Sequence, residues 1–216
     1  MHYKIVRLII YIQHILSKFI EEESYDPDNL MIVAPDTGAM DRAIYYADAL
    51  GVDVGVFYKR RDFSKVVNGK NPIGEHKFLW NDVEGKDLII TDDMIASGSS
   101  ILEVATDMKK RGANRIYLVS TFPLFTEGEK SVKAFDTAHE RGIFHKLYTT
   151  NVTYVPEDIQ NREWYKEVDC SKYLAKIINA IYERDSIRTF LDGRTKISEK
   201  MKTLGKYPTK KNDSNK

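Results

Sequence analysis

Apolar residues along the 216-residue chain fall into short continuous runs that alternate with stretches of helical spacing. Four runs have the length and β-branched content of buried strands: residues 30–35, 52–58, 88–91 and 115–122. Between them, residues 40–50 and 101–108 repeat apolar side chains every three or four positions, which predicts helices with one buried face. Strands that alternate with helices predict an α/β fold, in which a mostly parallel sheet carries helices on both faces.

The two ends of the chain differ from this central pattern. Residues 5–20 have the spacing of an amphipathic helix, and residues 21–29 form an acidic, turn-rich connector. We therefore expect an N-terminal segment over residues 1–28, with an apolar stripe that needs a partner, and a main domain over residues 29–187. Residues 188–216 are basic and polar with few apolar positions, which is typical of a flexible tail.

Composition narrows the class of protein. A formal net charge of +1 argues against a nucleic-acid-binding surface over the whole chain. No apolar run approaches the roughly 18 residues of a membrane span. Cys170 is the single cysteine, which fits a reducing compartment and excludes an internal disulfide. We therefore expect a cytoplasmic protein with neither nucleic acid nor membrane as a partner.

Three polar loops follow three of the predicted strands: "PDTGA" at residues 35–39, "KRRD" at 59–62 and "DDMIASGSS" at 92–100. Ligands of open α/β sheets bind beyond the carboxyl ends of the strands, so we expect all three loops at one edge. The second loop belongs to a polar stretch over residues 59–76, rich in glycine, asparagine and proline, which we predict to be one long functional loop.

The last of these loops combines two kinds of chemistry. Ser97, Gly98 and Ser99 precede a predicted helix, whose free N–H groups and small side chains can cradle a phosphate. Asp92 and Asp93 cannot bind that same phosphate, and they are better suited to accept hydrogen bonds from ribose hydroxyls. Phosphate and diol together indicate a sugar phosphate. An acidic turn with a serine N-cap is the purely structural alternative.

The segments "VAPDTGAMDRA", "GVFYKRRD" and "DVEGKDLIITDDMIASGSSI" occur here in one order and spacing. Together they resemble the C-terminal half of ribose-phosphate pyrophosphokinase, a family with the type I phosphoribosyltransferase fold. The resemblance covers residues 29–187. It implies an enzyme that uses Mg²⁺ and transfers diphosphate from ATP to ribose 5-phosphate, giving phosphoribosyl diphosphate (PRPP) and AMP.

The resemblance also implies roles for individual residues. It implies that Asp92 and Asp93 hold the ribose hydroxyls, and that the 5-phosphate is held by Ala96, Ser97, Gly98, Ser99 and Ser100. It implies that Asp36 binds Mg²⁺, and that the loop facing the diphosphate consists of Thr37, Gly38 and Ala39. Lys59 and Arg61 match the basic catalytic pair of a mobile loop.

The chain departs from the family pattern in two respects. Ala96 stands where the family usually carries an acidic residue, and Ser99 replaces a glycine, where we expect left-handed backbone and a strain of about 1 kcal/mol. The family's N-terminal half, which supplies much of the ATP site, has no counterpart. We therefore expect a homo-oligomer or association with such a half. A nucleobase phosphoribosyltransferase and a non-catalytic regulatory subunit stay open as alternatives.

Overall fold

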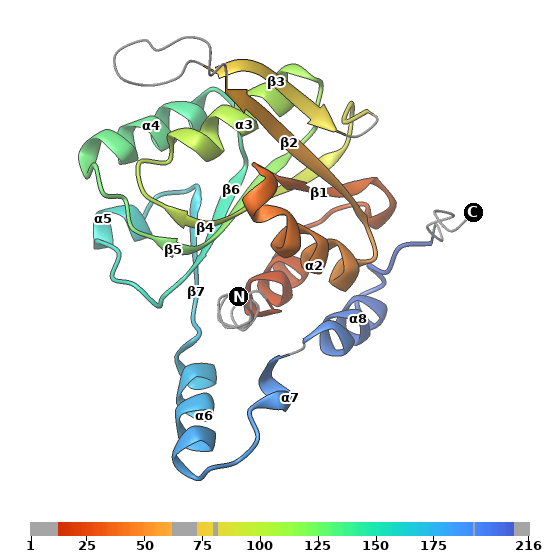
Figure 1. Cartoon of the computed structure of the whole chain (residues 1–216), viewed down its shortest axis with the longest axis vertical. Helices are drawn as coiled ribbons and strands as arrows, with labels where there is room; N and C mark the ends of the chain where they lie inside the picture. The colour runs from red at the N-terminus through yellow and green to blue at the C-terminus, as the bar shows by residue number, and fades with distance from the viewer. Residues whose placement is uncertain (1–12, 62–72, 80–81, 192, 210–216) are drawn as a thin grey trace.

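A computed structural model describes residues 13–61, 73–79, 82–191 and 193–209. One seven-stranded sheet has the order β3-β2-β1-β4-β5-β6-β7 (Figure 1). Its strands are β1 (Leu30–Ala34), β2 (Asp53–Arg61), β3 (Ile73–Leu79), β4 (Asp87–Ile95), β5 (Ile116–Pro123), β6 (Lys146–Thr150) and β7 (Tyr165–Val168). All neighbouring strands are parallel except β2 and β3, which are antiparallel. The predicted α/β fold with a mostly parallel sheet is confirmed.

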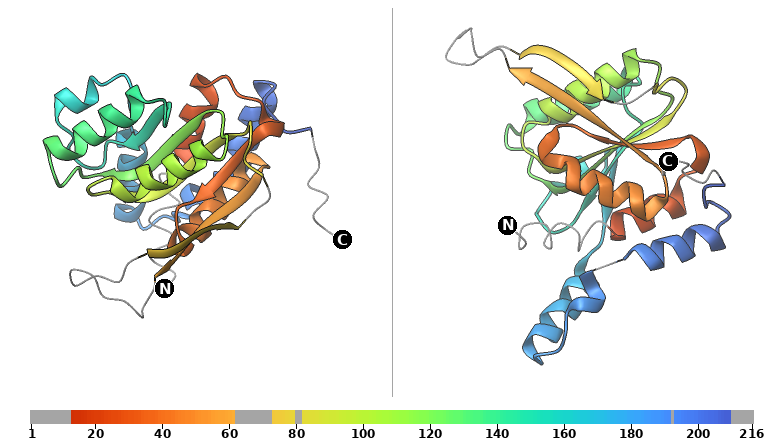
Figure 2. Two further views of the ribbon diagram at one scale, coloured as in Figure 1. Left: turned by 90° about the horizontal axis from the view of Figure 1, so that it is seen from above. Right: turned by 45° about the vertical axis from the view of Figure 1, so that its right-hand side comes forward.

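Helices cover both faces of this sheet. The helices of the described chain, besides the helical residues 13–22, are η1 (Pro27–Asn29), η2 (Thr37–Ala39), α2 (Met40–Leu50), α3 (Ser99–Lys110), α4 (Glu129–Glu140), α5 (Glu157–Gln160), α6 (Ser171–Tyr182), α7 (Arg188–Leu191) and α8 (Arg194–Thr203). One face packs against α2, α8 and the helical residues 13–22, and the other packs against α3 and α4 (Figures 1 and 2). Among the residues described, no helix has the length and apolar content that crossing a membrane would require.

The helical residues 13–22 belong to the core of this domain. Ile15, Leu16, Phe19 and Ile20 are fully buried in the same cluster as the α2 face of the sheet. Glu23, in the predicted connector, is buried as well. Its two carboxylate oxygens accept hydrogen bonds from the hydroxyls of Tyr117 (3.0 Å) and Tyr148 (2.6 Å). The apolar stripe of residues 13–22 is therefore covered by this chain itself, and the predicted boundary after residue 28 does not separate two packing units.

The C-terminal region corrects a second expectation. The predicted flexible tail contains α7 and α8, and α8 packs against α2. Ile197 and Met201 of α8 are buried, and Lys206 donates hydrogen bonds to the carbonyl oxygens of Ile20 and Glu23, each at 2.6 Å. Two apolar residues four positions apart are enough to dock one helical face, although the rest of the segment is polar.

The prediction of one long loop over residues 59–76 is also wrong, because both ends of this segment are strands. β2 continues to Arg61, and β3 begins at Ile73 and runs antiparallel to it, with Lys59 beside His76 and Arg60 beside Glu75. The middle of the predicted loop lies outside the described residues. These strands form an arm that extends beyond the rest of the sheet (Figure 2, right), where β2 pairs with β3 alone.

Candidate functional site

The carboxyl ends of β1, β2 and β4 meet at one edge of the sheet. β1 lies between the other two and is parallel to both, with Ala34 beside Val56 and Val33 beside Ile90. The single turn η2 follows β1 and contacts both β2 and β4. The loops after β1 and β4 therefore open onto the same edge, as the alternating pattern of the sequence predicts.

The loop after β1 has a defined shape that depends on Asp36. This residue is the N-cap of η2, and its Oδ1 accepts a hydrogen bond from the Ala39 N–H at 3.0 Å. Asp36, Thr37 and Gly38 are exposed, whereas Ala39 is buried. One carboxylate oxygen thus fixes the turn, and the other stays available to a ligand at the edge of the sheet.

β4 extends further than the sequence predicts. We expected the strand to end at Thr91, but Asp92 pairs with Ser120 and Met94 pairs with Phe122 of β5, so the strand continues to Ile95. The two adjacent carboxylates are therefore held by the sheet itself, and the loop before α3 shortens to residues 96–98. A rigid strand positions side chains more accurately than a loop does.

The acidic pair on β4 is electrostatically strained. Burial, together with the neighbouring Asp93, raises the pKa of Asp92 to about 7. Oδ1 of Asp92 accepts a hydrogen bond from the Asp93 N–H at 2.8 Å, and Oδ1 of Asp93 accepts one from the Met94 N–H at 2.9 Å. Such a pair gains stability from any ligand that donates hydroxyl hydrogen bonds or brings positive charge.

Arg42 is a site residue that the sequence reading missed. It lies on α2, its side chain is 10 % exposed, and its Nη2 is 3.7 Å from Oδ1 of Asp92. Its Nε is buried and has no hydrogen-bond partner within the described part of the chain. One feature of the sequence could have indicated Arg42: a helix is predicted to begin directly after "DTGA", and Arg42 is the third residue of that helix, α2. A buried guanidinium beside a carboxylate supplies fixed positive charge for an anionic ligand.

The loop between β4 and α3 forms a compact turn. Gly98 has φ +81°, and a Cβ atom there would lie 2.2 Å from Cε2 of Phe135 on α4. The hydroxyls of Ser97 and Ser99 are 2.9 Å apart, and Ser99 is the first residue of α3. The prediction of backbone strain at Ser99 is wrong, because the residue with left-handed backbone is Gly98, one position earlier. The first turn of α3 consequently begins without strain.

Lys59 and Arg61 lie on β2 beyond the end of β1. The last residue of β2 that pairs with β1 is Val56, and the strand then continues with β3 alone as far as Arg61. A register irregularity between Arg60 and Arg61 interrupts this pairing. The backbone of both residues therefore belongs to the part of β2 that pairs with β3 alone, next to the edge where β1 and β4 end. The structure does not describe their side chains.

The donor set limits what kind of metal site is possible. No group of three or more acidic, histidine or cysteine side chains comes together in the described residues, so the protein offers no complete metal cage there. Mg²⁺ usually binds one or two carboxylates, several waters and substrate phosphates. The free oxygen of Asp36 fits a metal of this kind, which would arrive with its phosphates.

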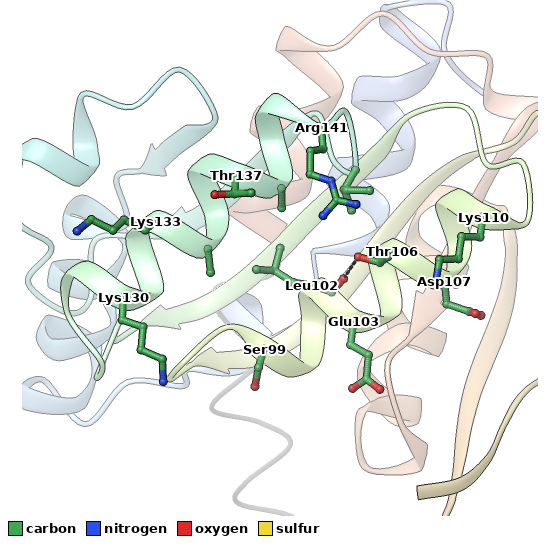
Figure 3. A pocket seen from close by; sticks show the side chains of 13 residues that line it. Ser99, Leu102, Glu103, Thr106, Asp107, Lys110, Lys130, Lys133, Thr137 and Arg141 are labelled. Atoms are coloured by element: carbon green, nitrogen blue, oxygen red, sulfur yellow. Dashed lines mark hydrogen bonds between the residues drawn. The ribbon is translucent and has the colours of Figure 1, made fainter.

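A separate groove lies between α3 and α4, with a volume of about 660 Å³ (Figure 3). Leu102, Ala138 and Ile143 are among its apolar lining residues, and lysines and Arg141 stand around its edge. Ser99 is the one predicted site residue that lines it. This groove therefore lies beside the loop after β4, and the acidic pair does not face it.

Comparison with known proteins gives one consistent match. The family described as "Phosphoribosyl transferase domain" matches residues 3–145. A curated ribose-phosphate pyrophosphokinase of Ralstonia nicotianae is 30 % identical over 178 residues, which are 82 % of this chain and 52 % of that protein. A second, from Staphylococcus aureus, is 29 % identical over 82 % of this chain and 51 % of its own length.

A solved structure agrees with these sequence matches. The phosphoribosylpyrophosphate synthetase of Mycobacterium smegmatis superimposes with a TM-score of 0.63 and 25 % identity, over 80 % of this chain and 51 % of that one. The chain thus spans about half the length of the relatives that it matches. The resemblance read from the motifs is confirmed.

Proposed function

The chain belongs to the phosphoribosyl transferase domain family, and we propose that it binds ribose 5-phosphate or PRPP at the carboxyl ends of β1 and β4. We propose further that it is the corresponding half of a ribose-phosphate pyrophosphokinase, which transfers diphosphate from ATP to ribose 5-phosphate. Nucleotide biosynthesis in the cytoplasm is the setting that this reaction implies.

The observation that carries the proposal is the raised pKa of Asp92 beside a compact turn at the start of α3. Asp92 and Asp93 would accept hydrogen bonds from the two ribose hydroxyls. The 5-phosphate would lie over residues 96–100, where the first N–H groups of α3 and the hydroxyls of Ser97, Ser99 and Ser100 can donate to it. The loss of an acidic side chain at Ala96 removes one ribose contact that relatives of this type carry.

In the transfer itself, the C1 hydroxyl oxygen of ribose 5-phosphate attacks the β-phosphorus of ATP. A new P–O bond forms, the bond between the β-phosphorus and the oxygen on the α-phosphorus breaks, AMP leaves, and the proton of the C1 hydroxyl passes to solvent. Catalysis of this kind depends on positioning and on neutralising charge. Arg42, Lys59 and Arg61 are the cations of this chain that we assign to the transferred diphosphate.

Mg²⁺ would neutralise the phosphates when it is bound with ATP, and Asp36 would hold it. Thr37 and Gly38 are exposed and would lie along the diphosphate, and Gly38 has no side chain that obstructs the approach of a ligand to the backbone. Ala39 is buried and keeps the turn closed against the sheet.

Calorimetric titration with ribose 5-phosphate and with PRPP tests the binding site. We expect binding by the natural chain, at least a tenfold loss of affinity in Asp92→Asn/Asp93→Asn, and a similar loss of PRPP affinity in Arg42→Met. Asp48→Asn is the matched control, because Asp48 is an exposed aspartate of α2 away from this edge. Unchanged binding in the double variant would contradict the proposed site.

Since the chain spans about half the length of its relatives, a regulatory subunit that binds the same ligand without turnover is the second candidate. An assay for AMP formed from ATP, ribose 5-phosphate and Mg²⁺ separates the two. AMP formation that is lost in Arg42→Met assigns catalysis to this chain. Ligand binding without AMP formation by the chain alone, together with a changed rate of AMP formation when the chain is added to a full-length relative, assigns the regulatory role.

A further inference from the structure

A buried serine on the strand next to the acidic pair lacks a hydrogen-bond partner. Ser120 lies on β5 and is fully buried, and its Oγ has no partner among the described residues. Leaving a buried hydroxyl unpaired is costly, and native proteins rarely do so unless a water, a ligand or a second state of the site supplies the partner. The position of this hydroxyl therefore indicates which partner it can reach.

The strand register places Ser120 beside Asp92. Asp92 of β4 pairs with Ser120 of β5, which pairs in turn with Thr149 of β6. Side chains of paired residues in parallel strands point to the same face, and the strands are about 4.8 Å apart, so a serine hydroxyl can reach a carboxylate on the next strand. Thr149 already donates its hydroxyl to Tyr165 at 2.7 Å. Asp92 is thus the acceptor in this row to which Ser120 can donate.

The other side of Asp92 has no neighbouring strand. The last register between β1 and β4 pairs Val33 with Ile90, so no residue of β1 pairs with Asp92, and Arg42 of α2 approaches it there. Arg42 and Asp93 are the charged groups that the described structure places against Asp92. Burial, together with Asp93, raises the pKa of Asp92, and Arg42 opposes this rise. The ionised form of Asp92 therefore gains from any further hydrogen-bond donor.

We infer that Ser120 is a positioning residue of the acidic pair, whose hydroxyl turns to donate a hydrogen bond to the Asp92 carboxylate when that group ionises. The inference rests on the proposed function, in which ionised Asp92 accepts a hydrogen bond from a ribose hydroxyl. The proton of Asp92 passes to solvent, and rotation about the Cα–Cβ bond brings the serine hydroxyl to the carboxylate without moving the backbone. Ser120 acts on the ligand through Asp92 alone.

The carboxylate has room for this additional bond. Oδ1 of Asp92 accepts a hydrogen bond from the Asp93 N–H at 2.8 Å, and a carboxylate offers about four acceptor positions. Ser120 and a ligand hydroxyl can therefore donate to it at the same time. Hydrogen bonds to a charged acceptor are roughly twice as strong as neutral ones, so Ser120 favours the ionised form of Asp92 over the protonated form.

Titration of Asp92 in Ser120→Ala tests this contact without any ligand. The side-chain carboxyl carbon resonance of Asp92 reports its protonation, and loss of the donor should raise the titration midpoint by about one pH unit. Ser131→Ala is the matched control, because Ser131 on α4 is also buried and its Oγ also lacks a partner among the described residues. Ser120→Thr keeps the hydroxyl and should restore the natural midpoint. Ser120→Cys, which has nearly the same shape but is a weak donor, should titrate like Ser120→Ala.

The affinity for ribose 5-phosphate gives the second readout. Since the sugar requires ionised Asp92, Ser120→Ala should bind about five- to tenfold more weakly than the natural chain between about pH 6 and pH 7, and the two affinities should converge near about pH 9. The phosphate of the ligand titrates in the same way with both proteins, so the difference between them isolates Asp92. A purely structural role of Ser120 would give a loss that does not change with pH.

The outcomes separate this inference from the proposed function. An unchanged midpoint in Ser120→Ala, or an equal shift in Ser131→Ala, overturns the contact between Ser120 and Asp92. A loss of affinity that is the same at every pH rejects the positioning role. If the midpoint shifts but the natural chain binds no ribose 5-phosphate, the hydrogen bond is established, and the proposed function fails together with the role of Ser120 in binding.

Discussion

At the scale of single residues, the acidic pair on β4 is a place where ligand binding and stability oppose each other. The pKa of Asp92 is about 7 in the folded chain, well above the ordinary value of 3.8, so the folded state retains a proton that the unfolded state releases. Stability is thus lost as pH rises from about 4 to about 7, and the loss is complete above pH 7.

Asp92→Asn removes this penalty, because an amide is neutral at every pH. We expect the variant to gain on the order of 1–3 kcal/mol more stability at pH 8 than at pH 5, where Asp92 is already largely protonated and serves as its own control. Urea unfolding of both proteins at the two pH values measures the gain. An equal difference between natural chain and variant at pH 5 and pH 8 would refute the raised pKa.

Gly98 offers a second test at this scale. Gly98→Ala must accept both a left-handed backbone and a Cβ atom 2.2 Å from the Phe135 ring, so we expect a loss of about 2–4 kcal/mol and weaker phosphate binding. Gly85→Ala is the matched control. Its φ is +71°, but nothing lies within 4 Å of the added Cβ, so the loss should be about 1 kcal/mol. Equal losses in both variants would show that Phe135 imposes no constraint.

At the residue scale, the sequence predicted site residues that are neighbours in the chain, but it did not predict contacts between side chains of different elements. The acidic pair and the serine-rich turn were visible because they are contiguous and end a strand. Arg42 was not, because its relevance comes from the position of its Nη2 on α2, 3.7 Å from Oδ1 of Asp92 on β4, which no local pattern records. The expected strain at Ser99 failed for a related reason: one residue of offset in the turn moved the left-handed conformation to Gly98.

At the scale of elements, a buried carboxylate joins the N-terminal helical residues to the sheet. Glu23 follows that helix and accepts hydrogen bonds from Tyr117 of β5 and Tyr148 of β6. Nζ of Lys146 lies 3.6 Å from Glu23 as well, so the charge has a partner. The element is therefore attached to the sheet by apolar packing and by a buried polar connection at Glu23.

Glu23→Ala should leave two buried hydroxyls without their acceptor and cost about 2–4 kcal/mol in the free energy of unfolding. Glu22→Ala is the adjacent control. Glu22 forms ion pairs with Lys18 and Lys166, each at 2.9 Å, but it is partly exposed, so its removal should cost at most about 1 kcal/mol. Denaturant unfolding monitored by tyrosine fluorescence and circular dichroism compares them. A loss for Glu23→Ala no larger than for Glu22→Ala would show that this connection is dispensable.

The elements that sequence patterns identified are those with continuous apolar runs or long helical faces. The predicted strands at residues 30–35 and 88–91 were confirmed as the cores of β1 and β4. The predicted strand at residues 52–58 was confirmed within β2, whereas residues 59–61 of β2 and the start of β3 were missed because they extend past the neighbouring strand β1. Apolar periodicity identifies elements that have one buried face, and strand ends that lie past the neighbouring strand give a weaker signal of this kind.

At the scale of the whole molecule, segments from both ends of the described sequence pack on the same sheet, and the chain spans about half the length of its relatives. The N-terminal helical residues and α8 come from opposite ends of the sequence and pack in one cluster over one face of the sheet. The sequence showed the first of these helices by its apolar stripe. It did not show what covers that stripe, because Phe19 packs on Tyr117 and Tyr148 of distant strands and α8 comes from the other end of the sequence.

Truncation after Ile187 tests whether α8 is part of the domain. It removes the buried Ile197 and Met201 and the hydrogen bonds of Lys206 to Ile20 and Glu23, and it exposes their partners on the helical residues 13–22. Since each buried side chain of this size contributes about 2–5 kcal/mol, we expect the chain to lose 5 kcal/mol or more, or to become insoluble.

Truncation after Thr209 is the control for this last experiment, because it keeps every described contact of α8, including the hydrogen bond from the Thr209 N–H to Asp28 at 2.9 Å. Its urea midpoint should match that of the natural chain. A tail that served only as a flexible extension would give the same midpoint in both truncations. A large loss confined to the longer deletion would instead show that the basic C-terminal region is part of the core, in the cluster that α8 shares with the helical residues 13–22.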